Sequence, residues 1–593
     1  MAGNILQLSA QSKERKIEEV TIQGKFLNLP VKKVSENVTV ITRDQIQNTP
    51  AKSVEEVLAQ FTGFDIRRRG SNGVQADISL RGSSFEQVLI LVNGIRMSDS
   101  QTGHNSMSLP FDLASVERIE VIKGPSARSF GQNAYAGVVN IITKASDEEN
   151  VLVSGSGGDF GTYALGLGAN FGSKKISNFI QVNTASSEGY RYNTDYKISN
   201  IYYQNEIALQ NGKLKFQAGI QEKKFGANGF YASPSAIDQY EETQASIVSL
   251  GLNQNFNTIK LNSNIYWRRG QDMYEYIRNK PEIYRNMHIG NNIGAELNGT
   301  YHSGLGITGL GVELRKEFLA SNNLGHRERF ITQVFMEHHF SFIQNKLNIS
   351  PGISWANYAE EGNFFYPGLD VGFDLTENHK FYGNIAKVNR IPTFTDLYYV
   401  SKTEAGNPGL KPEHAVAAEL GYRYQINNFV GKVSGFLRNS DNSIDWVKQN
   451  VNDIWRAENI GEIDTKGIEV ELSQHFESFV KSYSVGYTFL ESKNSQPQNL
   501  MSRYVMENLK HQFVAKLENR FFKNLTNQLI YRYNERVTTG SYQTLDEKLS
   551  YDFQNLNLYI LINNITNTEY TETFGIPMPK RWFHVGFTYK IGL

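Results

Sequence analysis

From about residue 145 to its end, the chain alternates apolar and polar residues with a period of two. The segment 213–221 (KLKFQAGIQ) follows this pattern strictly. Small and polar residues such as His584 and Thr588 occupy one face of the C-terminal segment. This alternation is typical of strands that span a membrane with one face toward lipid and the other toward a polar lumen. The apolar residues of the C-terminal segment share the other face, namely Phe583, Val585, Phe587, Tyr589, Ile591 and Leu593.

The length of this region limits the number of strands. The 448 residues of 146–593 accommodate 22 strands at about 10 residues per span plus a turn or loop, and 20 or 24 strands also fit. No apolar run in the sequence approaches the roughly 18 residues that a transmembrane helix needs. The sequence therefore predicts an all-β, antiparallel transmembrane barrel.

The first 145 residues follow a different pattern. The segment 116–123 (VERIEVIK) alternates apolar and charged residues, and Gly124 and Pro125 mark a turn. The segment 138–143 (VVNIIT) is nearly continuously apolar and rich in β-branched residues, as a strand buried on both faces would be. We therefore expect a separate domain here, with a buried sheet of its own.

Two short helices are predicted in the same domain, at 42–46 and 53–58. In the second, Ser53 and Glu56 have the spacing of a capping box. Strands and short helices in one compact region predict an α/β domain at 26–145, ahead of the barrel at 146–593.

Several strings of residues, in a fixed order, carry a family resemblance. The chain reads TGFDI at 62–66, ISLRG at 78–82, VLILVNGIR at 88–96, and VERIEVIKGPSA…FG…AYAGVVNIITK between 116 and 144. Farther on it reads RIPTFTDLY, GNPGLKPE and NNITNT. In this order the strings resemble the TonB-dependent outer-membrane receptors, closest to their vitamin B12 receptor branch, over residues 17–593. Thr62 and Asn93 replace the family's usual proline and aspartate, which leaves the fold prediction unchanged.

The resemblance implies an architecture and a mechanism. It selects 22 strands for the barrel, places the α/β domain in the lumen as a plug, and leaves 1–25 as an N-terminal extension. It implies active import across the outer membrane of a Gram-negative bacterium by a monomer surrounded by outer-membrane lipid. TonB and its inner-membrane complex would energise the import. No ATP chemistry is required.

The extension contains an alternating segment at about 17–24 that is similar to the TonB box of these receptors. Such a segment pairs with TonB by strand addition, which needs free backbone donors and acceptors. On sequence alone, a frayed terminal strand is the other interpretation. The predicted box residues are Ile17, Glu18, Glu19, Val20, Thr21 and Ile22.

Two polar loops between plug strands are the candidate ligand-binding regions. In receptors of this family such loops face outward and contact ligand, and neutral hydrogen-bonding groups suit a large solute. The basic run 67–69, directly ahead of the first loop, is interpreted as a solvated face or as an attraction for an anionic ligand. The candidate residues are Asn72 and Gln75 in the first loop, and Ser100, Gln101, Thr102, His104 and Asn105 in the second.

The resemblance favours cobalamin or a related corrinoid as the solute. A ferric siderophore or another metal chelate is the alternative, and a surface lipoprotein that hands ligand over stays open.

Receptors of the vitamin B12 branch also hold calcium in acidic loops. Calcium needs about six to eight oxygen ligands, and the acidic content here is thinner, so calcium stays open as a cofactor. Its candidate ligands are Glu188, Asp195, Asp238 and Glu241.

Composition narrows the remaining classes of function. Equal numbers of basic and acidic residues, 60 each, argue against a nucleic-acid partner. The absence of cysteine excludes disulfides, thiolate metal sites and cysteine nucleophiles. Residues 1–12 lack the basic and long apolar regions of a secretory signal, so export is inferred from the rest of the chain.

Two functions of other classes are weighed against import. A passive porin or a surface adhesin is one, but neither needs a plug or a TonB box. A barrel hydrolase is the other, and it is disfavoured because no nucleophile–base arrangement is visible. We therefore expect no enzymatic activity.

Overall fold

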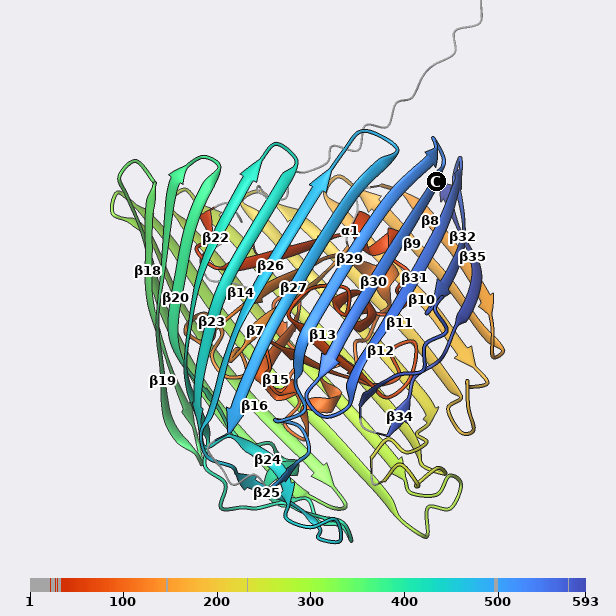
Figure 1. The fold of residues 1–593 in the computed structure, drawn as a ribbon. Coiled ribbons are helices and arrows are strands. Elements are labelled where there is room, and N and C mark those ends of the chain that lie inside the picture. The colour runs from red at the N-terminus through yellow and green to blue at the C-terminus, as the bar shows by residue number, and fades with distance from the viewer. Residues whose placement is uncertain are drawn as a thin grey trace, which may run out of the picture.

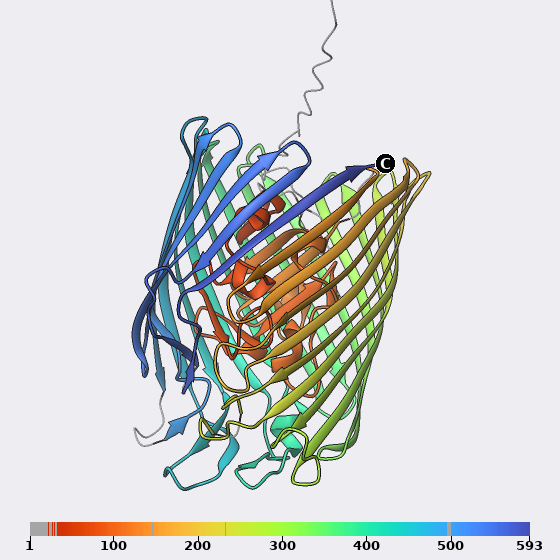
Figure 2. The same cartoon turned by 90° about the vertical axis from the view of Figure 1, so that its right-hand side faces the viewer.

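The computed structural model describes residues 22, 27, 29, 33–144, 148–231, 233–494, 500–573 and 575–593. Twenty-two antiparallel strands form a barrel, which closes where β35 (Trp582–Gly592) pairs with β8 (Asn150–Gly158). Figures 1 and 2 show the barrel from two sides, with the N-terminal domain inside it. The predicted fold class and strand number are confirmed. Among the described residues, no helix has the length and apolar character to cross a membrane.

The strands between these two pair with their neighbours in chain order around the barrel. They are β9 (Thr162–Ser173), β10 (Ile176–Ser187), β11 (Tyr196–Leu209), β12 (Gly212–Gly226), β13 (Tyr240–Phe256), β14 (Ile259–Glu275), β15 (Arg285–Ser303), β16 (Gly306–Ser321), β17 (Gly325–Phe342), β18 (Leu347–Tyr358), β19 (Gly362–Thr376), β20 (His379–Arg390), β22 (Glu413–Ile426), β23 (Phe429–Asp441), β26 (Ile463–His475), β27 (Val480–Asn494), β29 (Leu509–Phe522), β30 (Leu525–Arg536), β31 (Gly540–Phe553) and β32 (Leu556–Asn563).

The period-two pattern of the sequence becomes the two faces of the barrel wall. On β35, Val585 is 47% exposed on the outer surface, whereas His584 is 2% exposed on the lumen side. Phe587 and Ile591 follow Val585 outward. The outer face is therefore apolar and the inner face polar, as the sequence predicts.

We expect a lysine on the outer face of β35 to impair assembly. Val585→Lys places a charge against lipid, which costs about 2–4 kcal/mol near the middle of a membrane. Thr588→Lys places the same charge on the lumen side and should fold. Heat-modifiable electrophoretic mobility of the two variants measures the folded fraction. Equal folding would show that Val585 does not face lipid.

The two ends of the barrel differ in the length of their connections. At one end the turns contain two to four residues, as between β9 and β10 or between β17 and β18. At the other end the longer loops span 391–412, 442–462 and 564–581. Barrels of the outer membrane have short periplasmic turns and long extracellular loops, so the long-loop end is the extracellular one.

The plug is organised around a five-stranded sheet in the lumen. Its central strand, β7, is buried along its whole length, which confirms the prediction for 138–143. The sheet order is β1 (Asn37–Thr42), β6 (Val116–Lys123), β7 (Gly137–Thr143), β4 (Val88–Val92) and β5 (Ile95–Arg96). A two-stranded sheet of β2 (Phe64–Arg68) and β3 (Ala76–Leu80) lies beside it.

Short helices complete the plug: α1 (Arg43–Asn48), α2 (Val54–Leu58), α3 (Ala127–Phe130) and the 3-10 turn Gly103–Met107. The capping box predicted at Ser53 is wrong, because its side chain makes no capping hydrogen bond. The Glu56 carboxylate instead accepts the backbone N–H of Lys52 at 2.9 Å. A capping box occurs at α1, where Thr42 and Gln45 cap each other's backbone N–H groups.

Buried ion pairs fasten the plug to the barrel wall. Arg81 lies 2.9 Å from Glu419 and 2.8 Å from Glu469, and Lys123 lies 2.7 Å from Glu471. Burial alone would lower the pKa of Arg81 and of Lys123, but these carboxylates outweigh it and raise both. Breaking a buried pair by removing one partner costs about 3–5 kcal/mol, so the plug is held firmly on this side.

Candidate ligand-binding site beneath the loop cover

The plug presents two loops to the extracellular end of the barrel, and we call them the plug apex. The loop 69–75 turns at Asn72 and Gly73, where φ is 54° and 76°, a region that asparagine and glycine tolerate best. The loop 97–107 ends in a 3-10 turn that Thr102 caps, its hydroxyl accepting the N–H of His104 at 3.4 Å. Local turn chemistry thus fixes both loops.

The second loop lies beneath a barrel loop. The carbonyl oxygens of Ser100 and Gln101 accept hydrogen bonds from the N–H groups of Phe394 and Thr395, at 2.9 and 3.0 Å. The Gln101 side chain also donates to Asp272 of β14 at 3.1 Å. Ser100 and Gln101 are therefore buried, although the sequence places them in an outward-facing polar loop.

His104 is held from three sides. Its Nδ1 lies 2.6 Å from Asp77, its ring stacks on Phe85 at 4.3 Å, and Tyr504 packs edge-on at 5.7 Å. Burial alone would raise the pKa of Asp77, but Arg69 and His104 outweigh it and hold that pKa well below its usual range. Asp77 thus stays ionised and orients the imidazole.

The remaining candidates divide between two recesses. Gln75, His104 and Asn105 border one recess of about 290 Å³, between the apex and the barrel wall. Asn72 borders another and donates its amide N–H to the hydroxyl of Tyr196. Of the two candidates in the first loop, Gln75 therefore lies beside the second loop, whereas Asn72 lies apart from it.

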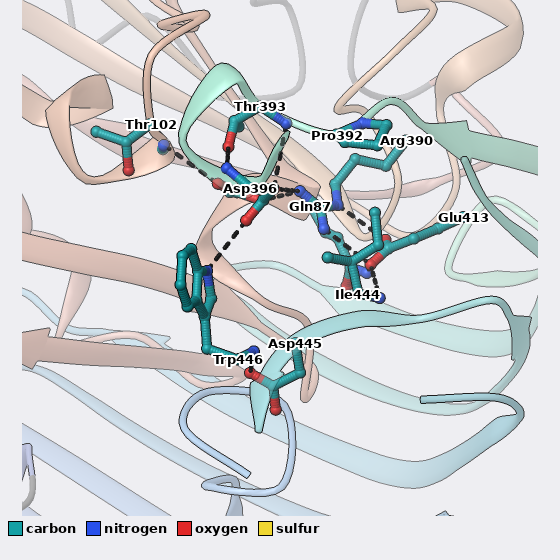
Figure 3. Close-up of polar contacts among 12 residues, drawn as sticks. Gln87, Thr102, Arg390, Pro392, Thr393, Asp396, Glu413, Ile444, Asp445 and Trp446 are labelled. Carbon is teal, nitrogen blue, oxygen red and sulfur yellow. Dashed lines mark hydrogen bonds and ion pairs between the residues drawn. The ribbon is translucent and has the colours of Figure 1, made fainter. Parts of the chain in front are cut away.

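A hub of charged residues fixes the barrel loop above the apex (Figure 3). Arg390, at the end of β20, pairs with Glu86 of the plug and donates to Glu413 of β22 at 3.0 Å. Asp396, in helix α4 (Phe394–Tyr398), lies 3.3 Å from Arg390 and accepts the indole N–H of Trp446 at 3.2 Å. One hub thus joins the plug, two barrel strands and two loops.

The loops above the apex also share a small sheet. Its strand order is β21, β25, β24 and β28, drawn from three separate loops. We call these loops, 391–412, 442–462 and 495–508, the loop cover, with its residues 495–499 outside the described chain. The strands are β21 (Glu404–Ala405), β24 (Ile444–Lys448), β25 (Trp455–Asn459) and β28 (Met501–Ser502).

Asp445 ties two loops of the cover together. Its carboxylate accepts the N–H groups of Tyr504 and Val505 at 3.2 and 3.1 Å. Burial raises the pKa of Asp445 to about 6, although these hydrogen bonds oppose it. Beside it, Arg503 packs against the rings of Trp455 and Tyr504. The cover is therefore one connected unit, in which Arg503 pairs with Glu404 and packs among aromatic rings.

The basic run 67–69 does not form a solvated face. Arg67, Arg68 and Arg69 are all at most 7% exposed. Arg67 pairs with Asp65 at 3.1 Å, Arg68 with Glu572 at 2.6 Å, and Arg69 with Asp77 at 2.7 Å. Each guanidinium therefore already has a carboxylate partner. The pairs of Arg67 and Arg69 lie within the plug, and the pair of Arg68 joins the plug to the barrel loop 564–581.

The calcium candidates do not assemble into one site. Both Asp195 oxygens accept from Arg278, at 2.7 and 2.9 Å. Asp238 accepts from a tyrosine hydroxyl, Glu241 is buried against Tyr231, and Glu188 is exposed. Within the described chain, no three histidine or acidic side chains are grouped to hold a metal ion. Calcium binding stays an untested prediction.

The predicted TonB box lies outside the described residues except for Ile22. Ile22 is fully buried, and its N–H donates to the carbonyl of Leu29 at 3.3 Å. It packs in a cluster with Val38 and Leu89 of the plug, beside Ile307 of β16. Ile307 lies next to a short turn, so this end of the predicted box is at the periplasmic end of the barrel.

Comparison with protein-family models decides the family. The TonB dependent receptor-like β-barrel model matches residues 221–565, and the TonB-dependent receptor plug domain model matches residues 30–138. The chain belongs to the TonB-dependent receptors. Its location is therefore the outer membrane, and its family implies TonB and a small-molecule ligand as partners. Members of this family are transporters and receptors rather than enzymes.

Individual relatives of this TonB-dependent receptor fall into two groups. The vitamin B12 transporter BtuB of Vibrio vulnificus is 25% identical over 97% of this chain and 95% of its own, and that of Photobacterium profundum is 24% identical over 95% and 93%. The ferric enterobactin receptor PfeA of Pseudomonas aeruginosa has a TM-score of 0.78, at 18% identity over 94% of this chain and 99% of its own. The iron transporter FrpB of Neisseria meningitidis has a TM-score of 0.79, at 16% identity over 94% and 100%.

The sequence did not reveal the residues that hold the cover. Arg390, Asp396 and Glu413 lie within the strings RIPTFTDLY and GNPGLKPE, which served only as marks of the family. In these strings the charged residues stand among apolar and turn residues. That setting could have indicated burial, because a buried charge needs a partner of opposite charge. Trp446 has no comparable signal.

Proposed function

We propose that this receptor imports cobalamin or a related corrinoid by TonB-dependent active transport. The similarity to vitamin B12 transporters over nearly the whole of both chains carries the proposal. The apex supports it, because Gln101, Thr102 and Asn105 offer neutral hydrogen-bonding groups to a large solute. The cover must move aside before such a solute can reach Gln101.

A ferric siderophore is the second candidate. The rings of Trp455 and Tyr504 in the loop cover favour it, since they offer a stacking surface to an aromatic chelate, while the neighbouring Arg503 is already paired with Glu404. Equilibrium binding of a panel of cobalamins and ferric chelates to the purified receptor separates the two. Saturable binding of a ferric chelate without cobalamin binding would overturn the corrinoid proposal.

Removing the polar side chains of the second apex loop should weaken ligand binding. Replacing Gln101, Thr102 and His104 together by Ala deletes hydrogen bonds worth about 1 kcal/mol each, so we expect affinity to fall roughly 100-fold. Titration of the ligand that the parent binds measures the effect. Thr258→Ala, in a periplasmic turn, is the control. Unchanged affinity of the triple variant would place the binding site elsewhere.

A further inference from the structure

A second recess lies away from the cover, between the plug and the barrel wall. It leaves about 40 Å³ of space for water-sized groups, which is room for one small anion and not for a large solute. Lys52, Glu56 and Arg68 border it from the plug, and Arg532 and Trp582 from the barrel. The loop 564–581 forms its extracellular margin, where Lys580 is exposed.

The recess holds hydrogen-bond donors that have no acceptor. Trp582 is 3% exposed, and its indole N–H has no hydrogen-bond partner among the described residues. Arg532 is 6% exposed, and its Nε likewise has no partner in the described part of the chain. Leaving a buried donor unsatisfied costs about 1–3 kcal/mol, so two such donors on one recess indicate a place for an acceptor.

Lys52 adds a cationic donor to the recess. Its Nζ lies 4.9 Å from the centre of the Trp582 ring and contacts Nε2 of His584. Among the described residues, no carboxylate lies within ion-pair distance of Lys52. Burial lowers its pKa to about 7, so an ammonium there is readily lost unless an anion stabilises it.

The acceptors around the recess are already engaged. Glu56 accepts the backbone N–H of Lys52 at 2.9 Å and lies 3.4 Å from Arg68. Asp546 lies 3.2 Å from Arg532 and accepts the N–H of Asn564 at 2.7 Å. The recess therefore offers unpaired hydrogen-bond donors but no free carboxylate, which suits a ligand group that accepts hydrogen bonds.

We propose that this recess is a second binding site, which takes an anionic oxygen group, phosphate or carboxylate, on the Lys52 ammonium and the Trp582 N–H. The site borders the first apex loop at Ser71 and Asn72 but includes no residue of the second apex loop or of the cover, and it does not depend on which solute is imported. Its affinity rises as Lys52 gains its proton. The other charged groups that act on Lys52 are Glu56 and Arg68 of the plug, Asp159 between β8 and β9, and Asp546 of β31, with His584 of β35 in contact.

Calorimetric titration of the purified full-length receptor with sulfate tests the site, because sulfate keeps its charge across the pH range used. We expect saturable binding that weakens about tenfold between pH 6 and pH 8, as a group with a pKa near 7 loses its proton. Parallel titrations at pH 6.5 with inorganic phosphate and with succinate show which anionic group the site prefers.

Two variants and their matched controls locate the binding. Lys52→Met should abolish the pH dependence and weaken sulfate binding at least about tenfold, and Trp582→Phe should weaken it while keeping the ring. Lys548→Met and Trp355→Phe make the same changes outside the recess and should bind as the parent does. The absence of saturable sulfate binding by the parent would overturn the proposal. Unaltered sulfate binding by Lys52→Met would overturn it too. Both results are independent of any transport assay, so they test this site separately from the proposed function.

Discussion

A disulfide between the loop cover and the plug apex is expected to abolish ligand binding. Gln101→Cys and Thr395→Cys introduce cysteines at two residues joined by a main-chain hydrogen bond of 3.0 Å. An N–H···O=C bond of this length keeps the two Cα atoms within about 7 Å of each other, close to the upper limit that a disulfide spans. Oxidation should lower affinity about 100-fold or more, because the form that admits ligand is no longer populated.

The same protein supplies the control for this experiment. Since the chain contains no cysteine, the introduced pair cannot exchange with another. Comparing oxidised and reduced forms cancels the loss of the Gln101 side chain. A second disulfide, from Thr526→Cys and Ser550→Cys across β30 and β31, should leave binding unchanged. Full affinity of the oxidised 101–395 protein would show that ligand binds without displacement of the cover.

The barrel could be predicted from the sequence because the pattern that determines it lies within each strand. Each strand must turn apolar residues to lipid and polar residues to the lumen, so the pattern of 583–593 is read directly as two faces. The buried plug strand at 138–143 can be predicted in the same way, because burial on both faces requires a continuous apolar run. The strand number was not fixed by length and came from the family resemblance.

The site was harder to predict because its contacts join residues distant in sequence. Polarity suggested that Ser100 and Gln101 face solvent, but a loop about 295 residues later covers them. Charge suggested a solvated run at 67–69, but its carboxylate partners include Glu572 of the loop 564–581. Ser53 does occupy the N-cap position of α2, but no capping box forms there, since the Glu56 carboxylate accepts the backbone N–H of Lys52 instead.

Transport would require contacts to open at both ends of the receptor, in the cover and at the periplasmic end of the plug. At the extracellular side, the hub of Arg390, Asp396 and Glu413 holds loops and plug together. At the periplasmic side, Ile22 is buried in the plug cluster. For TonB to pair with the segment around Ile22, that residue must leave its cluster, so ligand binding would have to favour this release.

We expect Val20→Pro to abolish uptake while leaving ligand affinity nearly unchanged. Val20 lies in the middle of the predicted TonB box at 17–24, a segment identified from its sequence. Proline removes a backbone N–H and fixes φ, so an added strand loses a hydrogen bond of its ladder and cannot lie flat. Strand addition draws much of its affinity from those bonds, so the receptor should no longer couple to TonB.

Cell uptake and equilibrium binding, measured on the same variants, separate coupling from recognition. Gln23→Ser is the matched control, because it changes a side chain of the segment but keeps its backbone donors, and it should transport normally. The apex and the cover lie at the extracellular end and keep all their residues in both variants. Normal uptake by Val20→Pro would contradict the assignment of the TonB box. It would also favour passive diffusion, since a passive pore needs no coupling segment.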